Sequence, residues 1–122
     1  MSARAITVLV CGGRKYADKE WLEHRLSQLH EVRAFGLLIH GGAKGADHLA
    51  SLWAKSNGVA TLCFPANWKA RRATGPMRNK QMLAEGRPDL VIAFDGGAGT
   101  ANMIDTATRA GVQVIEIEGR KP

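Results

Sequence analysis

Three apolar runs in this chain each end in a glycine-rich turn. Residues 6–10, 37–40 and 90–94 are apolar, and the turns that follow them read CGGR, GGAKGAD and DGGAGT. Glycine after a buried strand lets the main chain approach a ligand closely, because no Cβ stands in the way. Such turns meet at one crevice when the strands are parallel and their carboxyl ends share an edge. This feature predicts a parallel sheet with a ligand site at that edge.

Apolar strands and amphipathic helices alternate along the whole chain. The spacing predicts strands over 6–10, 37–40, 59–64, 90–94 and 112–117, and a long loop over 65–74. It also predicts a helix capped by Asp18, a helix over 46–56, a helix with Pro76 in its first turn, and a helix over 98–110 closed by Gly111. Right-handed crossovers favour the strand order 3-2-1-4-5. We therefore predict an α/β, Rossmann-like three-layer sandwich with a five-stranded parallel sheet.

The composition is that of one folded domain. The chain has 122 residues, of which 45% are hydrophobic and 23% charged, so we expect a single domain over 1–122 with one core. The formal net charge of +6 favours anionic partners. No apolar run approaches the roughly 20 residues of a membrane helix, and the N-terminus lacks the features of a signal peptide. We expect a cytoplasmic protein with no membrane partner, in which Cys11 and Cys63 stay thiols.

The turn after residues 90–94 predicts a phosphate site. Gly96, Gly97, Gly99 and Thr100 combine main-chain donors, a hydroxyl and the dipole of a helix start. Asp95 would repel a phosphate placed beside it. Its side chain is therefore expected to face a sugar or a cation, or to bond the loop itself.

The turn over 41–47 fits neither the P-loop pattern nor the full dinucleotide fingerprint. Gly41, Gly42 and Asp47 are expected on the ribose side of a ligand, with Gly45 in the same turn. Two roles stay open for Asp47. It can be an acid at the start of the following helix, favoured there by the helix dipole or as a cap, which is the simpler interpretation. It can also accept a hydrogen bond from a ribose hydroxyl.

A basic segment carries Lys69, Arg71, Arg72, Arg78 and Lys80. Such runs are commonly solvated faces, but a helix starting near Pro76 would bring Arg78 and Asn79 over the crevice. Arginine binds phosphate bidentately, and Arg14 in the first turn offers a second cation. Trp68 either stacks on a base or closes the core. No spacing of metal ligands is present, so we expect neither a metal nor a cofactor.

These landmarks together resemble the YspA-like (cpYpsA-related) family of the SLOG superfamily. The matching segments are residues 11–14, 40–47, 65–68, 75–79 and 94–100. The resemblance implies a Rossmann-like fold that binds a nucleotide or a nucleotide-derived ligand. More distantly, the chain is similar to Lonely Guy phosphoribohydrolases, which cleave the N-glycosidic bond of a nucleoside monophosphate, and to the DprA family, which binds single-stranded DNA.

Three functions remain open. The first is a module that binds or senses a nucleotide-like small molecule through residues Gly12, Gly13, Arg14, Gly41, Gly42, Gly45, Asp47, Trp68, Arg78, Asn79, Asp95, Gly96, Gly97, Gly99 and Thr100. The second is an N-glycosidic hydrolase. The acid that follows the Gly-Thr turn in Lonely Guy enzymes is missing here, so Asp47, Asp95 or Asp105 would have to serve, and no catalytic residue is assigned.

The third is nucleic-acid binding through the basic segment, which is less favoured because interleaved aromatic residues are lacking.

Assembly is also expected. Trp21, Leu22, Leu52 and Trp53 extend the apolar surface of the first two helices beyond one narrow stripe. A small sheet cannot easily cover all of them. We therefore expect a homodimer or a higher homo-oligomer, most simply about a two-fold axis.

Overall fold

The computed structural model describes residues 4–64 and 75–119. The predicted loop over 65–74, with Trp68, Lys69, Arg71 and Arg72, lies outside them. The strands are β1 (Ile6–Cys11), β2 (Phe35–His40), β3 (Ala60–Cys63), β4 (Leu90–Ala93) and β5 (Gln113–Glu116). They form one parallel sheet in the order β3-β2-β1-β4-β5. The predicted order and fold class are confirmed.

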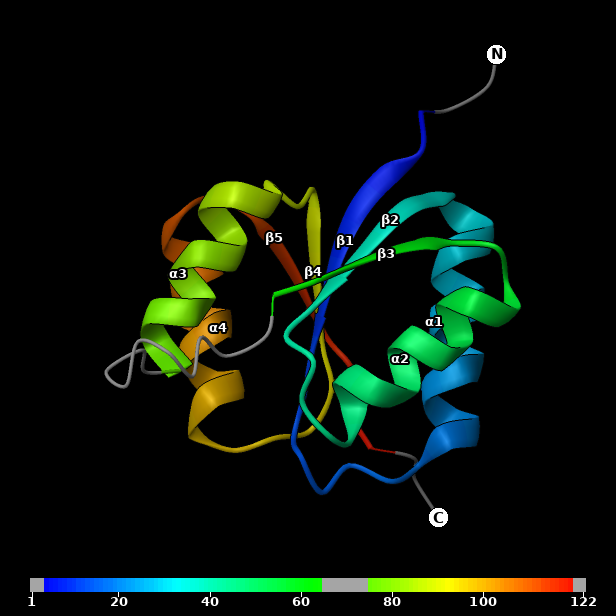
Figure 1. Cartoon of the computed structure of the whole chain (residues 1–122), viewed down its shortest axis with the longest axis horizontal. Helices are drawn as coiled ribbons and strands as arrows, with labels where there is room; N and C mark the ends of the chain where they lie inside the picture. The colour runs from blue at the N-terminus through cyan, green and yellow to red at the C-terminus, as the bar shows by residue number, and fades with distance from the viewer. Residues whose placement is uncertain (1–3, 65–74, 120–122) are drawn as a thin grey trace.

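Helices cover both faces of this sheet. The helices α1 (Lys19–Val32) and α2 (Ala46–Ser56) lie on one side, and α3 (Gly75–Gly86) and α4 (Ala98–Arg109) lie on the other (Figure 1). Short turns follow the carboxyl ends of β1, β2 and β4 at one edge of the sheet, and each of the last two leads directly into a helix. This arrangement brings the three glycine-rich turns together.

The central strand β1 is buried on both faces because it lies between two layers of helices. Val8 and Val10 pack into the core under α1 and α2, where Leu22 and Leu26 are fully buried. Leu9 and Cys11 point to the opposite face and pack with Met82 and Met103 of α3 and α4. A continuous apolar run is typical of a strand buried in this way.

Several predicted boundaries are confirmed and others shift. The Asp18 carboxylate accepts a hydrogen bond from the Trp21 N–H at 3.2 Å, as expected for the cap of α1. The prediction for α2 matches, and Pro76 lies in the first turn of α3. Strand β2 begins earlier than predicted, since Phe35 pairs with Ile6 and is itself buried. The outer strands β3 and β5 are shorter than predicted.

The apolar residues that suggested assembly are largely internal. Leu22 and Trp53 are buried in the core, and the Trp53 indole N–H donates to Ser27 Oγ at 2.9 Å. Trp21 is partly buried and donates to the Glu118 carbonyl at 2.9 Å. Leu52 is 40% exposed. The expectation that these apolar side chains could not all be covered was wrong for Leu22 and Trp53, because α1 and α2 pack against each other. Assembly itself stays a prediction.

No helix among the described residues is long and apolar enough to cross a membrane.

Candidate ligand-binding cleft

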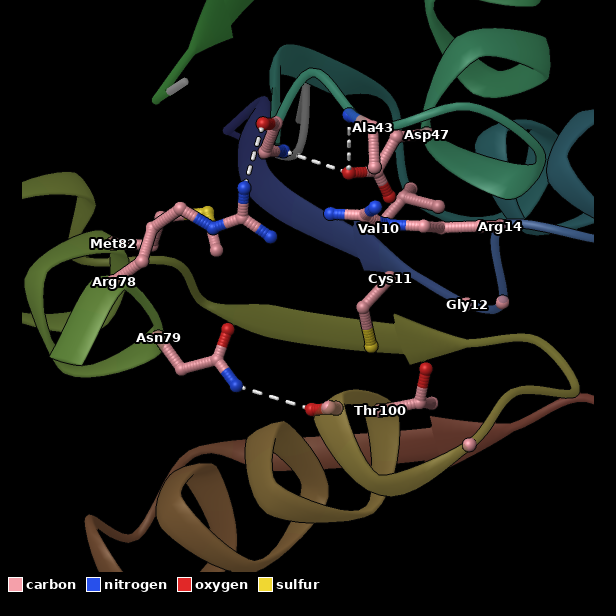
Figure 2. A pocket seen from close by; sticks show the side chains of 14 residues that line it. Val10, Cys11, Gly12, Arg14, Ala43, Asp47, Arg78, Asn79, Met82 and Thr100 are labelled. Carbon is pink, nitrogen blue, oxygen red and sulfur yellow. Dashed lines mark hydrogen bonds between the residues drawn. The ribbon is translucent and has the colours of Figure 1, made fainter. Parts of the chain in front are cut away.

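A cleft of about 370 Å³ opens at the carboxyl ends of β1, β2 and β4 (Figure 2). Its walls come from the three glycine-rich turns and from the first half of α3. It is lined by Val10, Cys11, Gly12, Gly13, Arg14, Gly41, Ala43, Asp47, Arg78, Asn79, Met82, Gly97, Gly99 and Thr100.

The three turns are tied together at Gly13. Its N–H donates to the Asp95 carbonyl at 2.8 Å, and its carbonyl accepts from the Ala46 N–H at 3.2 Å. The first turn is therefore bonded to the third turn on one side and to the start of α2 on the other. The cleft is fixed by main-chain contacts that need no ligand to form.

Two of the predicted site glycines serve this packing. Gly45 has a φ of 78°, and a Cβ there would overlap the Gly13 carbonyl oxygen. A Cβ on Gly96 would overlap Thr100 Oγ1 and would lie 2.7 Å from the Gly13 nitrogen. Neither glycine lines the cleft. Their lack of a side chain is explained by close contact within the protein.

Gly97 and Gly99 differ from these two. A Cβ on either would meet no described atom within 4 Å, and both residues line the cleft. Gly97 has a φ of −98° and a ψ of −144°, a combination outside the regions that other residues favour, whereas Gly99 lies within α4. Packing against the described residues therefore calls for glycine at neither position, and the helical backbone does not call for it at Gly99.

The start of α4 presents unpaired donors to the same space. The N-cap of α4 is Gly97, which has no side chain that could bond the first N–H groups of the helix. Ala101 is the first residue of α4 whose N–H donates to a described carbonyl, that of Gly97 at 3.1 Å. The N–H groups of Ala98, Gly99 and Thr100 have no acceptor in the described part of the chain. Together with the helix dipole, they create an environment that favours an anion.

Asp47 lies in the first turn of α2, as the simpler of its two interpretations predicted, but it is not the N-cap of this helix. The N-cap is Gly45, and the Asp47 Oδ2 accepts from the N–H groups of Gly41 at 3.0 Å and Ala43 at 3.3 Å. Burial raises the pKa of the Asp47 carboxyl, although these two donors act in the opposite direction. The other carboxylate oxygen has no described hydrogen-bond partner and points into the cleft (Figure 2).

His40 accepts a hydrogen bond from a further N–H of this turn. Its Nδ1 accepts from the Gly42 N–H at 3.0 Å. Burial lowers the pKa of His40, which agrees with a neutral imidazole that accepts through one nitrogen. The N–H groups of Gly41, Gly42 and Ala43 are thus all bonded to protein groups. This turn offers the cleft a carboxylate, whereas the start of α4 offers free donors.

Arg78 brings a positive charge to the opposite wall. Its Nη1 donates to the Gly41 carbonyl at 3.2 Å, while its Nε is buried and has no hydrogen-bond partner among the described groups. The guanidinium points from α3 into the cleft (Figure 2). In the described part of the chain no carboxylate forms an ion pair with it.

Asn79 joins the two helices that flank the cleft. Its Nδ2 donates to the Gly99 carbonyl at 3.1 Å and to Asn102 Oδ1 at 3.0 Å. Two acceptors on one side fix the orientation of the amide, because only the nitrogen can donate to both. The Asn79 carbonyl oxygen consequently faces the cleft (Figure 2).

The remaining predicted residues take different positions. Arg14 is exposed and its side chain extends along the cleft, whereas Gly42 is exposed and does not line it. Asp95 and Gly96 line a second cavity of about 270 Å³ beyond the β4–α4 turn, together with Glu116 and Glu118. Asp95 is thus absent from the walls of the cleft, and Trp68 lies outside the described residues.

Sequence reasoning missed four lining residues, namely Val10, Cys11, Ala43 and Met82. Met82 was predictable, because it follows Arg78 by four positions and so shares its helix face. Cys11 was interpreted only as a buried thiol. Burial and the nearby Asp47 charge raise the pKa of Cys11 to about 12, so the thiol stays protonated. Among the described residues no His, Cys, Asp and Glu side chains gather in a group that could hold a metal.

Comparison with known proteins agrees with the observed fold. The family described as YspA, cpYpsA-related SLOG family (YAcAr) matches residues 6–70. The Gene 61 protein of Mycobacterium phage D29 is 32% identical over 124 aligned positions, which cover 94% of this chain and 98% of the phage protein. The solved structure of DNA processing protein A (DprA) from Streptococcus pneumoniae shares the fold, with a TM-score of 0.75 and 19% identity over 95% of this chain; the match spans 51% of the DprA chain. This chain belongs to the YspA, cpYpsA-related SLOG family.

Proposed function

We propose that this protein binds a nucleotide or a nucleotide-derived ligand in the cleft, with a phosphate group at the start of α4. The observation that carries this proposal is the pair Gly97 and Gly99. Both line the cleft, a Cβ on either would meet no described atom, and Gly99 lies in a helix whose backbone other residues adopt. A ligand that approaches the main chain closely gives a physical reason for both.

The charge distribution supports a phosphate at this end of the cleft. The free N–H groups of α4 and the guanidinium of Arg78 face the same space, and Arg14 lies at its rim. The Arg78 guanidinium forms no ion pair with a described carboxylate, so its charge is available to an anion in the cleft. A volume of about 370 Å³ suits a small molecule of nucleotide size.

Binding can be tested by calorimetry and thermal shift. The ligands are the four 5′-ribonucleoside monophosphates, ADP-ribose and inorganic phosphate. A ligand at 100 times its Kd stabilises the folded state by about 2.7 kcal/mol, which raises Tm by several degrees. Folded protein that binds none of these compounds at millimolar concentration would overturn the proposal.

A matched pair of variants localises the site. Arg78→Ala should weaken phosphate binding about 10- to 100-fold, because a charge-assisted hydrogen bond is lost. Lys80→Ala removes the same charge from an exposed position on α3 and should leave the affinity within about twofold. Equal losses in both variants would indicate a diffuse charge effect in place of a site.

One observation favours a second candidate, an N-glycosidic hydrolase. Among the described acids, Asp47 alone lines the cleft, whereas Asp95 and Asp105 do not. In such a reaction water adds to the anomeric carbon, the bond to the base nitrogen breaks, and ribose 5-phosphate and free base result. Asp47 would accept the proton of the water. Release of free base from a nucleoside monophosphate is measured by chromatography. Release that Asp47→Asn abolishes and Asp95→Asn retains would establish this activity.

A further inference from the structure

We propose that the cleft selects ribonucleotides over deoxyribonucleotides, and that Asp47 is the residue that reads the ribose hydroxyls. This inference rests on the proposed function, because it assumes that a phosphate occupies the start of α4. It adds the chemical class of the sugar and the residue that determines the specificity.

The orientation of Asp47 is set by the protein alone. Its Oδ2 is occupied by the N–H groups of Gly41 and Ala43, at 3.0 and 3.3 Å. Its other oxygen has no described partner and faces the cleft (Figure 2). An ionised carboxylate only accepts hydrogen bonds, so the group that meets this oxygen must be a donor. A phosphate is excluded from that position by charge repulsion.

The tied turns place this acceptor near the phosphate end of the cleft. Gly13 bonds the β4–α4 turn through its N–H and the start of α2 through its carbonyl, so Asp47 and the free donors of α4 lie on the two sides of one glycine turn. The sugar is the group next to the phosphate in a nucleotide. A 5′-phosphate held at α4 therefore leaves the sugar as the part of the ligand that reaches Asp47.

A second acceptor faces the same space. The Asn79 carbonyl oxygen points into the cleft because its amide nitrogen is bonded to Gly99 and Asn102. The Asn79 oxygen lies across the cleft from Asp47, so it is a separate acceptor for another part of the ligand (Figure 2). The inward oxygen of Asp47 can accept a hydrogen bond from a ribose 2′-hydroxyl, which a 2′-deoxyribose lacks.

Asp47→Asn is the sharpest test of this idea. The asparagine oxygen can still accept from Gly41 and Ala43, so the turn is kept, and the amide NH₂ then replaces the inward oxygen. The variant thus exchanges an acceptor for a donor at one position in the cleft. A circular-dichroism spectrum and a Tm close to those of the wild type confirm that its fold is retained.

The probes are AMP, GMP, CMP and UMP with their 2′-deoxy and 3′-deoxy counterparts, measured by calorimetry. Wild-type protein should bind the preferred ribonucleotide about 10- to 100-fold more tightly than its 2′-deoxy form, since a hydrogen bond to a charged acceptor is lost. In Asp47→Asn the two affinities should come within about threefold. Ribose 5-phosphate is measured as a further probe, which shows whether the protein binds the sugar phosphate without the base.

The outcomes separate the two proposals. Nucleotides that bind without preference for ribose, or a preference that survives in Asp47→Asn, would overturn the role of Asp47 and leave the phosphate site standing. Absence of binding to every phosphate compound would overturn both. Tight binding of ribose 5-phosphate with the same dependence on Asp47 would support the ribose readout.

Discussion

Asp47 and Arg78 are both held by Gly41, and these two described residues do not form an ion pair with each other. The Gly41 N–H donates to Asp47 Oδ2 at 3.0 Å, and its carbonyl accepts from Arg78 Nη1 at 3.2 Å. A Cβ on Gly41 would lie 3.1 Å from the Asp47 oxygen and 3.1 Å from the Arg78 guanidinium carbon. One main-chain residue thus holds a cation and an acceptor at the same cleft without an ion pair between them.

The first prediction separates the glycines of the cleft by function. Gly99→Ala should change the free energy of unfolding by less than about 1 kcal/mol, because the residue is helical and the new Cβ meets no described atom. This variant should nevertheless bind nucleotides at least about tenfold more weakly, since the methyl group occupies space beside the free donors of α4. Urea unfolding and calorimetry on the same samples measure both quantities.

Gly45→Ala is the contrasting variant. Its Cβ would overlap the Gly13 carbonyl oxygen, and its φ of 78° is unfavourable for alanine. We expect a loss of about 2–4 kcal/mol in the free energy of unfolding. A variant as stable as the wild type would show that the first turn is not tied to the start of α2 in the way described.

The second prediction concerns the chemistry of residue 78. Arg78→Lys keeps the positive charge but loses the planar guanidinium. The guanidinium can donate to the Gly41 carbonyl and face the cleft at the same time, and an ammonium group cannot reproduce this geometry. We expect this variant to lose about tenfold in affinity for nucleoside monophosphates, between wild type and Arg78→Ala. Calorimetry at two salt concentrations measures the affinities of the wild type and both variants. An Arg78→Lys variant that binds as tightly as the wild type would count against a bidentate contact.

The third prediction follows from the raised pKa of Asp47. A carboxyl whose pKa is higher in the folded state than its unfolded value of 3.8 favours folding at low pH. This contribution is complete below pH 3.8 and is lost as the pH rises through the folded-state pKa. Above that pKa the charged form costs about 1.4 kcal/mol for each unit of the shift.

Asp47→Asn should remove this dependence and be at least as stable as the wild type at pH 7. Urea unfolding of both proteins from pH 3.5 to 7.5 tests it, because the difference between the two curves removes contributions that they share. His40 also differs between the two proteins, because burial lowers its pKa while the Asp47 charge, which the variant removes, acts in the opposite direction. A wild type that gains stability relative to the variant as the pH rises from 3.8 would contradict the prediction.

The fourth prediction concerns the two thiols. Burial raises the pKa of Cys11 to about 12, so about one molecule in 10,000 carries the thiolate at pH 8. The pKa of Cys63 is also raised by burial, but its residue is exposed at the end of β3. An aromatic disulfide reagent should therefore label one thiol in native protein and two in denaturant. Cys63→Ser should abolish the rapid reaction, and its persistence would place the reactive thiol at Cys11.

The layers, the strand order and the meeting of the three turns follow from the sequence pattern alone. Alternation of strands and helices leads to a parallel sheet, and the fixed hand of the crossovers leaves few orders. Helix starts were also predictable where the signal is local, as at Asp18 and Pro76. Arg78 and Asn79 were expected over the crevice because a helix start after the third strand must lie near that edge.

The roles of residues whose partners lie elsewhere in the chain depend on tertiary packing. Gly96 and Gly97 are adjacent and chemically identical, yet Gly13 and Thr100 lie against the first while open space lies beside the second. Leu22 and Trp53 are internal because α1 packs on α2. Asp47 bonds Gly41 and Ala43 because the turn folds back on the carboxylate. Sequence patterns report periodicity and local propensity, whereas these roles depend on distances through space that form only when the turns are packed together.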